Sequence, residues 1–195
     1  MVFMKLDKLL QLLREKNLAE VKQLLLEMNA HDIASLIEEL PQELLIQVFR
    51  LLPKDSAVDV FVQMDEDVQR NLIATLTKGE AKEIIEDMFT DDAADLFEEM
   101  PAILVTSLLS SVDKDTRDAI NKLLKYRENS AGALMAVEYI HLKKGLSIKE
   151  SIKRIRKQAD DFVSYDSCFV TDNERRIIGK VSVKDLLIYD PTTLI

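Results

Sequence analysis

Short amphipathic units repeat about every 12 residues through the first two thirds of the sequence. From His31 onward, each unit opens with an acid, a proline or a small polar residue, and apolar residues follow at helical spacing. These openings lie at Asp32, Pro41, Pro53, Asp65, Lys78, Thr90, Pro101 and Asp113. A helix this short cannot bury its apolar stripe alone. The pattern therefore predicts helix-turn-helix pairs of about 24 residues that stack into an α-solenoid.

Two further helices are expected ahead of the repeat. Leucines at positions 6, 9, 10 and 13 lie on one helical face, and the rhythm resumes from Leu18 after a break at Lys16-Asn17. The rhythm ends at Tyr126 to Gly132, where Asn, Ser and Gly indicate a linker. We therefore divide the chain into an acidic helical-repeat domain over residues 1–129 and a second domain over residues 130–195.

The second domain has a different periodicity. Strands are expected at Glu138–Leu142, Cys168–Val170 and Ile177–Val181, and the last two are joined by a polar, turn-rich connector. Ser147 is expected to cap one helix, and a final helix begins near Asp185. The order β-α-β-β-α predicts a small α/β motif, so the fold class of the whole chain is mainly α.

Composition and charge exclude several classes of function. Residues 1–129 carry 26 acids and 15 bases, which argues against binding to a nucleic-acid backbone. No stretch of about 18 uncharged apolar residues is present, so this chain is not expected to cross a membrane by itself. Cys168 is the single cysteine, which fits a reduced cytoplasmic compartment. No phosphate-binding loop, metalloprotease motif or activated nucleophile is recognisable, so an enzyme is not expected.

The densest charge lies between Glu80 and Met100, where nine acids accompany one base, Lys82. At 100° per residue, Asp91 and Asp95 share the face opposite the apolar stripe and are expected to point outward. Like charges four residues apart cost a helix roughly 0.2–0.5 kcal/mol unless a cation neutralises them. Two interpretations stay open here: a metal site, or a solvated face that favours the helix dipole.

Three stretches together carry a family resemblance. Residues 126–140, YRENSAGALMAVEYI, resemble the junction of MgtE-type magnesium transporters. Residues 168–187, CFVTDNERRIIGKVSVKDLL, are similar to the core of a cystathionine-β-synthase (CBS) motif, and the acidic repeats resemble the N domain of the same transporters. The resemblance spans the chain and implies an α-superhelical domain over residues 1–129, followed by the first motif of a CBS pair over residues 130–195.

The resemblance implies the regulatory, Mg²⁺-sensing region of a divalent-cation transporter, at the cytoplasmic face of the cell membrane. In that family, Mg²⁺ neutralises acidic surfaces between the N and CBS domains and thereby gates the pore. The implied partners are the membrane pore domain of the same full-length protein and a second copy bound through the CBS region. Because one CBS motif and no membrane helix are recognisable in the sequence, we expect the chain to be either a fragment of a transporter or a protein without the pore, and the fragment is favoured.

By residue, the resemblance places metal ligands at Asp91 and Asp95 in TDDAAD and at Asp59 in SAVDVF. A backbone carbonyl would come from Gly132 or Ala133. The carboxylates that the family takes from the second CBS motif are missing, so a site in this chain would be incomplete. Oxygen ligands of this kind suit Mg²⁺, which is often held by one or two carboxylates and retained waters.

Two other functions stay open. The chain could be a metal-independent helical-repeat scaffold that binds protein partners. It could also sense adenine nucleotides, because Ser182 and Asp185 resemble the position at which nucleotide-binding CBS domains hold ribose. The same two residues form a capping arrangement at the start of an apolar helix, and that interpretation is favoured.

Overall fold

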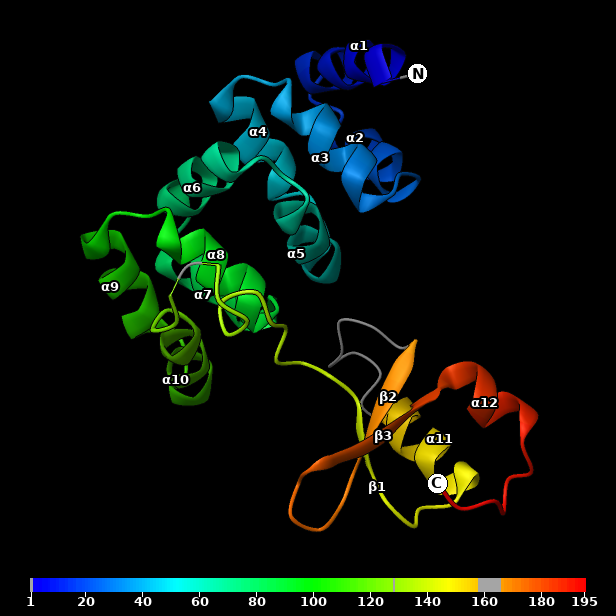
Figure 1. The fold of residues 1–195 in the computed structure, drawn as a ribbon. Helices are drawn as coiled ribbons and strands as arrows, with labels where there is room; N and C mark the ends of the chain where they lie inside the picture. Colours follow the sequence, from blue (N-terminus) through cyan, green and yellow to red (C-terminus); the bar gives the residue numbers. More distant parts are fainter. Residues whose placement is uncertain (1, 128, 158–165) are drawn as a thin grey trace. The chain divides into compact units, whose positions relative to one another are not determined.

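Short helices fill the first part of the chain and a small sheet with two helices fills the second (Figure 1). The computed structural model describes residues 2–127, 129–157 and 166–195. The chain divides into two compact units, one of residues 1–88 and 92–127 and the other of residues 89–91 and 128–195. The mainly α fold class with a small α/β motif is confirmed.

The helices of the first unit follow the 12-residue repeat along the chain. They are α1 (Val2–Arg14), α2 (Leu18–Leu26), α3 (Ala30–Glu38), α4 (Gln42–Phe49), α5 (Lys54–Val62), α6 (Glu66–Thr75), α7 (Lys78–Asp87), α8 (Thr90–Glu98), α9 (Ala102–Ser111) and α10 (Lys114–Leu123). From α2 onward, each helix begins 12 residues after the one before it, from Leu18 to Lys114. The expected repeat is therefore present with a constant period.

Local signals set where these helices begin. Pro41, Pro53 and Pro101 occupy the position before α4, α5 and α9, and their carbonyls accept the first helical hydrogen bonds. Proline fits there because its fixed φ suits a helix start and no N–H is lost from the helix. Asn17 and Asn29 cap α2 and α3 through their side chains. The break after α1 occurs where Lys16 adopts a positive φ of 55°.

One continuous hydrophobic core runs through the first unit, from Leu9 in α1 to Ile120 in α10. The odd-numbered helices pack in a row, since α1 contacts α3, α3 contacts α5, α5 contacts α7 and α7 contacts α9. Phe61 of α5 is fully buried and packs edge-on against Phe49 of α4, with ring centroids 6.4 Å apart. Burying each such side chain contributes about 1.5–3 kcal/mol, which a lone helix cannot obtain.

The second unit contains a three-stranded sheet in the order β1-β2-β3. Its elements are β1 (His141–Lys143), α11 (Ile148–Lys157), β2 (Ser167–Thr171), β3 (Ile177–Ser182) and α12 (Val183–Ile188). β1 pairs with β2 in parallel, and β2 pairs with β3 in antiparallel orientation. Leu142, Ile148, Cys168 and Leu186 form its core, and burial raises the pKa of the Cys168 thiol. The sequence order β-α-β-β-α is confirmed.

The first strand begins later than expected. The predicted strand covers residues 138–142, whereas β1 covers His141–Lys143 and Glu138 lies outside it. The prediction was wrong at Glu138 because apolar residues surround it. Residue periodicity alone does not distinguish a paired strand from an unpaired extended segment. In the part of the chain that is described, no helix is long and apolar enough to span a membrane.

Ion pairs link helices that lie two or three repeats apart. The Arg50 guanidinium, after α4, meets the Glu80 carboxylate of α7 with N–O distances of 2.8 and 3.1 Å. Glu80 also accepts the backbone N–H of Thr77 at 2.8 Å and so closes a capping box at the start of α7. The bond from Arg50, followed by the bond from Thr77, lowers the pKa of Glu80 to about 2.

Replacing Glu80 with Gln is expected to lower the free energy of unfolding by about 0.5–1.5 kcal/mol at pH 7, since a cap and a half-exposed ion pair are weakened. The pKa of Glu80 is lowered from 4.5 to about 2, so this stabilisation is complete above pH 4.5 and is lost as the pH falls toward 2. Urea unfolding between pH 7 and pH 3 measures the effect. Glu83→Gln, at an exposed position of the same helix, is the control. A difference from wild type that stays constant down to pH 3 would contradict this assignment.

Candidate functional site

The acidic helix α8 carries the candidate site. Its apolar stripe is buried as expected, since Ala93, Leu96 and Phe97 are at most 5% exposed. Asp95 is exposed, which also matches the expectation, and Glu98 on the same helix is exposed as well. Asp91 differs, because it is half-buried and its Oδ1 atom is buried with no hydrogen-bond partner among the described residues. A buried carboxylate oxygen without a partner is costly and suits a cation ligand.

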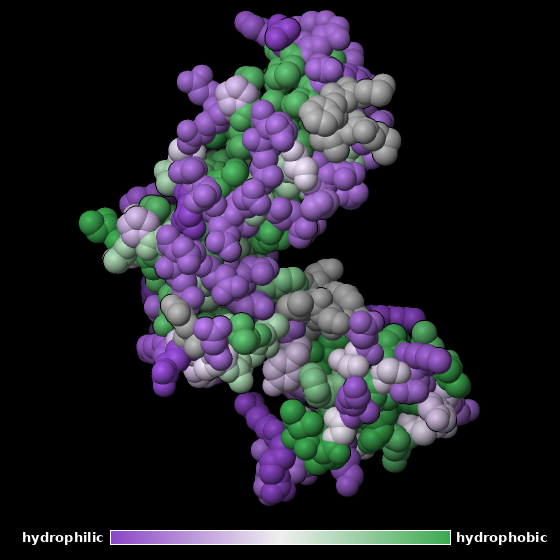
Figure 2. Space-filling view, turned by 45° about the horizontal axis from the view of Figure 1, so that its top comes forward, coloured by the Kyte–Doolittle hydropathy of each residue, from purple (hydrophilic) through white to green (hydrophobic). Residues whose placement is uncertain are grey.

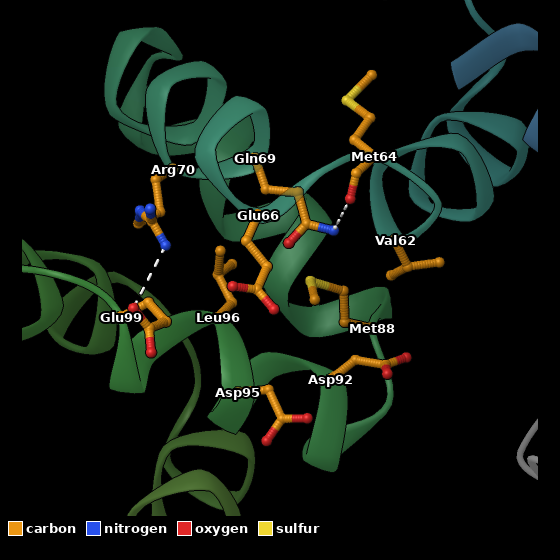
Figure 3. A pocket seen from close by; sticks show the side chains of 10 residues that line it. All are labelled: Val62, Met64, Glu66, Gln69, Arg70, Met88, Asp92, Asp95, Leu96 and Glu99. Atoms are coloured by element: carbon orange, nitrogen blue, oxygen red, sulfur yellow. Dashed lines mark hydrogen bonds and ion pairs between the residues drawn. The ribbon is translucent and has the colours of Figure 1, made fainter. Parts of the chain in front are cut away.

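An open pocket of about 230 Å³ lies between α6 and α8 (Figure 3). Its polar lining is mostly acidic and comprises Glu66, Gln69, Arg70, Asp92, Asp95 and Glu99. The apolar lining is supplied by Val62, Met64, Met88 and Leu96. The lining carries four carboxylates and one guanidinium, which gives this pocket a negative potential that attracts cations.

Arg70 and Gln69 order the wall of this pocket. The Nη1 atom of Arg70 lies 3.6 Å from Glu99 Oε2, and its Nη2 atom pairs with Asp67 on the same helix. The side-chain amide of buried Gln69 donates to the carbonyls of Phe61 and Met64 at 2.9 and 3.1 Å. Gln69 thereby satisfies backbone acceptors at the end of α5, which fixes that helix against α6.

The predicted ligands occupy separate places. Asp59 is exposed on α5 and lines a pocket of about 200 Å³ with Ser56 and Pro53. Asp95 lines the pocket between α6 and α8, and Asp91 lies on the lining of neither of these two pockets. Within the described residues, no three His, Cys, Asp or Glu side chains are grouped so as to hold a metal ion.

The other predicted site residues belong to the second unit. Gly132 and Ala133 lie in a turn in which the Ala133 N–H donates to the Ser130 carbonyl at 3.1 Å. Ser182 caps α12, its hydroxyl donates to Asp185 Oδ2 at 2.7 Å, and the Asp185 N–H donates back to Ser182 Oγ at 3.1 Å. The bonds from Ser182 lower the pKa of Asp185. Asp185 therefore serves as the acid of a capping box.

Three acidic residues near α8 were not identified as site residues from the sequence. Glu66 and Glu99 line the acidic pocket. In the sequence, the density of acidic residues around each of them was the only indication of such a role. Glu138 was placed in a strand, yet its Oε1 atom accepts the N–H of Thr90 at 3.1 Å and its Oε2 atom is buried without a hydrogen-bond partner in the described structure. A lone acid inside the apolar segment AVEYI was the available signal.

Solved structures of similar fold include the soluble part of a magnesium transporter, with a TM-score of 0.90, 22% identity, and coverage of 100% of this chain and 77% of that chain. Another is the cytosolic domain of the Mg²⁺ channel MgtE in complex with ATP, with a TM-score of 0.87, 30% identity, and coverage of 97% and 77%.

Two curated relatives are named magnesium transporter MgtE. The protein of Thermus thermophilus is 33% identical over 82 residues, which is 42% of this chain and 18% of that protein. The protein of Enterococcus faecalis is 30% identical over 76 residues, which is 39% of this chain and 17% of that protein. The matched segments span less than a fifth of the length of these relatives.

The model of the MgtE intracellular N domain family matches residues 28–129, which is more than half of the chain. The match covers α3 to α10, including the acidic helix and the whole lining of the pocket between α6 and α8. The protein therefore belongs to the MgtE family, and residues 28–129 are an MgtE intracellular N domain.

Proposed function

We propose that this chain is the Mg²⁺-sensing regulatory region of an MgtE-type magnesium transporter, at the cytoplasmic face of the membrane. The family match and the similar solved structure of the cytosolic domain of the Mg²⁺ channel MgtE support this assignment. The observation that carries it is the acidic helix α8, in which Asp91 presents a buried carboxylate oxygen without a hydrogen-bond partner in the described structure. Its partner would be the membrane pore domain of the full-length protein.

Charge neutralisation supplies the mechanism. When Mg²⁺ is scarce, the carboxylates of α8 and the neighbouring acidic pocket repel one another. Bound Mg²⁺ removes this repulsion and favours the conformation in which the carboxylates lie closer together, which we assign to the closed pore. Asp91 and Asp95 are the proposed ligands, Asp59 and a carbonyl of Gly132 or Ala133 are the proposed additional donors, and retained waters complete the shell.

Thermal unfolding with Mg²⁺, at constant ionic strength, tests the proposal. With free Mg²⁺ at about ten times its Kd, binding adds about 1.4 kcal/mol, which raises the Tm by roughly 3–5 °C at this chain length. The increase is expected to be lost in Asp91→Asn and reduced in Asp95→Asn. Glu98→Gln, which removes one exposed charge from the same helix, should keep it.

The metal-independent scaffold predicts a different result. A Tm that does not respond to millimolar Mg²⁺, or equal responses in wild type, Asp91→Asn and Glu98→Gln, would contradict the sensor and favour the scaffold. Matching the ionic strength with KCl separates ligation from screening, since screening acts on all exposed charges.

Adenine-nucleotide binding is a second candidate, favoured by the relative of 30% identity whose structure contains ATP. Asp185 uses Oδ2 for its bonds with Ser182, and Oδ1 takes no part in those bonds. ATP is expected to raise the Tm of the wild type and not that of Asp185→Ala. Glu150→Ala removes the equivalent box of α11 and should keep the ATP response, so loss in both variants would refute the assignment.

We also propose a homodimer formed through the CBS-type unit. Its surface exposes large apolar side chains, including Ile177 and Ile178 on β3 and Leu187 and Ile188 on α12, all at least half exposed. Figure 2 shows hydrophobic residues exposed at several places on the surface, including the lower part of the view. A patch of this kind favours association, and a second copy offers a self-complementary surface.

Sedimentation over a range of protein concentrations measures this association. Leu187→Glu is expected to weaken dimerisation, because a charge would be buried in the apolar contact. Ile103→Glu, at an 88% exposed position of α9, is the matched control and should leave dimerisation unchanged. A wild type that stays monomeric at high concentration would contradict the dimer.

A further inference from the structure

Local capping boxes close the starts of several helices in one way. A single carboxylate oxygen accepts both the backbone N–H and the hydroxyl of the residue three positions earlier. This pattern joins Thr77 to Glu80, Ser147 to Glu150, and Ser182 to Asp185, with donor–acceptor distances of 2.7–3.1 Å. Each box satisfies an N–H that the helix itself leaves unpaired.

A second capping device follows the helical repeat. Glu38 of α3 accepts the backbone N–H of Asp65, before α6, at 2.7 Å. Glu86 of α7 accepts the N–H of Asp113, before α10, at 2.8 Å. The second contact lies 48 residues after the first in the sequence. The repeat places an equivalent pair of positions halfway between them, at Val62 and Phe89. Neither residue has a carboxylate. The start of α8 therefore lacks the bond from a backbone N–H to a glutamate of an earlier helix that α6 and α10 have.

The start of α8 is instead capped by Glu138. Thr90 is the first residue of α8, and the residue three positions later is Ala93, which cannot close a local box. Glu138 Oε1 accepts both the N–H and the hydroxyl of Thr90, in the pattern of the local boxes. Thr90 and Glu138 belong to the same compact unit. The missing acid is thus supplied from 48 residues further along the chain.

This cap acts beside the candidate ligand. Asp91 follows Thr90 directly, so fixing the Thr90 N–H and hydroxyl fixes the backbone that carries the Asp91 side chain. Without these bonds, the first turn of α8 would fray, as uncapped helix ends do. A carboxylate that samples many positions binds a cation more weakly, because ordering it on binding costs entropy.

We propose that Glu138 is a positioning residue for the Mg²⁺ response, which it controls by capping α8 and holding Asp91 in place. This inference rests on the proposed function, in which Asp91 is a Mg²⁺ ligand. Glu138 acts through Thr90 by accepting hydrogen bonds, and its charge is not required for that role. A neutral side chain with the same acceptor geometry should therefore replace it.

Wild type, Glu138→Ala, Glu138→Gln and the control Glu150→Ala are compared in two measurements. Hydrogen exchange of the peptide containing residues 89–95, without Mg²⁺, reports the cap. A Mg²⁺ titration at constant ionic strength reports affinity. Glu138→Ala is expected to speed exchange in this peptide and weaken Mg²⁺ binding about threefold to tenfold, the change that losing one cap produces. Glu138→Gln should restore both values, and Glu150→Ala should alter neither.

Each other result has a defined meaning. If exchange and affinity in Glu138→Ala equal those of wild type, the positioning role is wrong. If Ala and Gln weaken Mg²⁺ binding equally while Gln keeps slow exchange, Glu138 acts through its charge as a ligand, which also overturns the proposal. If the wild type itself does not bind Mg²⁺, the proposed function fails, and the exchange data still decide whether Glu138 caps α8.

Discussion

Packing between neighbouring short helices is the interaction on which this structure depends. A helix of about ten residues is marginal in water, and its apolar stripe gains little free energy until another helix covers it. The constant 12-residue period solves this problem by placing equivalent stripes at equivalent positions, so the odd-numbered helices can pack in one row. The core that results is continuous from α1 to α10.

This packing also determines where charge can be. Because each helix uses its apolar stripe for the core, its acids remain on the surface or at helix ends. Some of these acids are paired across the repeat, as in the contacts of Arg50 with Glu80 and of Lys54 with Asp87 at 3.1 Å. The stretch from Glu80 to Met100 holds nine acids and one base. Arg50, Lys54 and Arg70 from other helices are too few to balance this charge, so the surface around α8 stays negative. A cation lowers the energy of such a surface.

Local patterns in the sequence predicted most of the fold. Proline and Asp signals placed several of the helix starts, and the buried face of α8 followed from helical spacing. The position of β1 and the half-burial of Asp91 were not predictable in this way. β1 is set by its pairing with β2, where His141 lies opposite Phe169. Asp91 follows Thr90, whose N–H is bonded to Glu138. A spacing rule contains no information about such contacts between distant residues.

The departure from the repeat at α8 marks a place where a helix depends on a residue outside the repeat. At Val62 and Phe89 the sequence lacks the acid that caps the equivalent helices α6 and α10. From local signals alone, the start of α8 would be left without this cap. Glu138 supplies the acid instead, so the first turn of α8 depends on a residue outside the repeat. A helix whose first turn depends on a distant carboxylate can respond to changes at that carboxylate, which a locally capped helix cannot do.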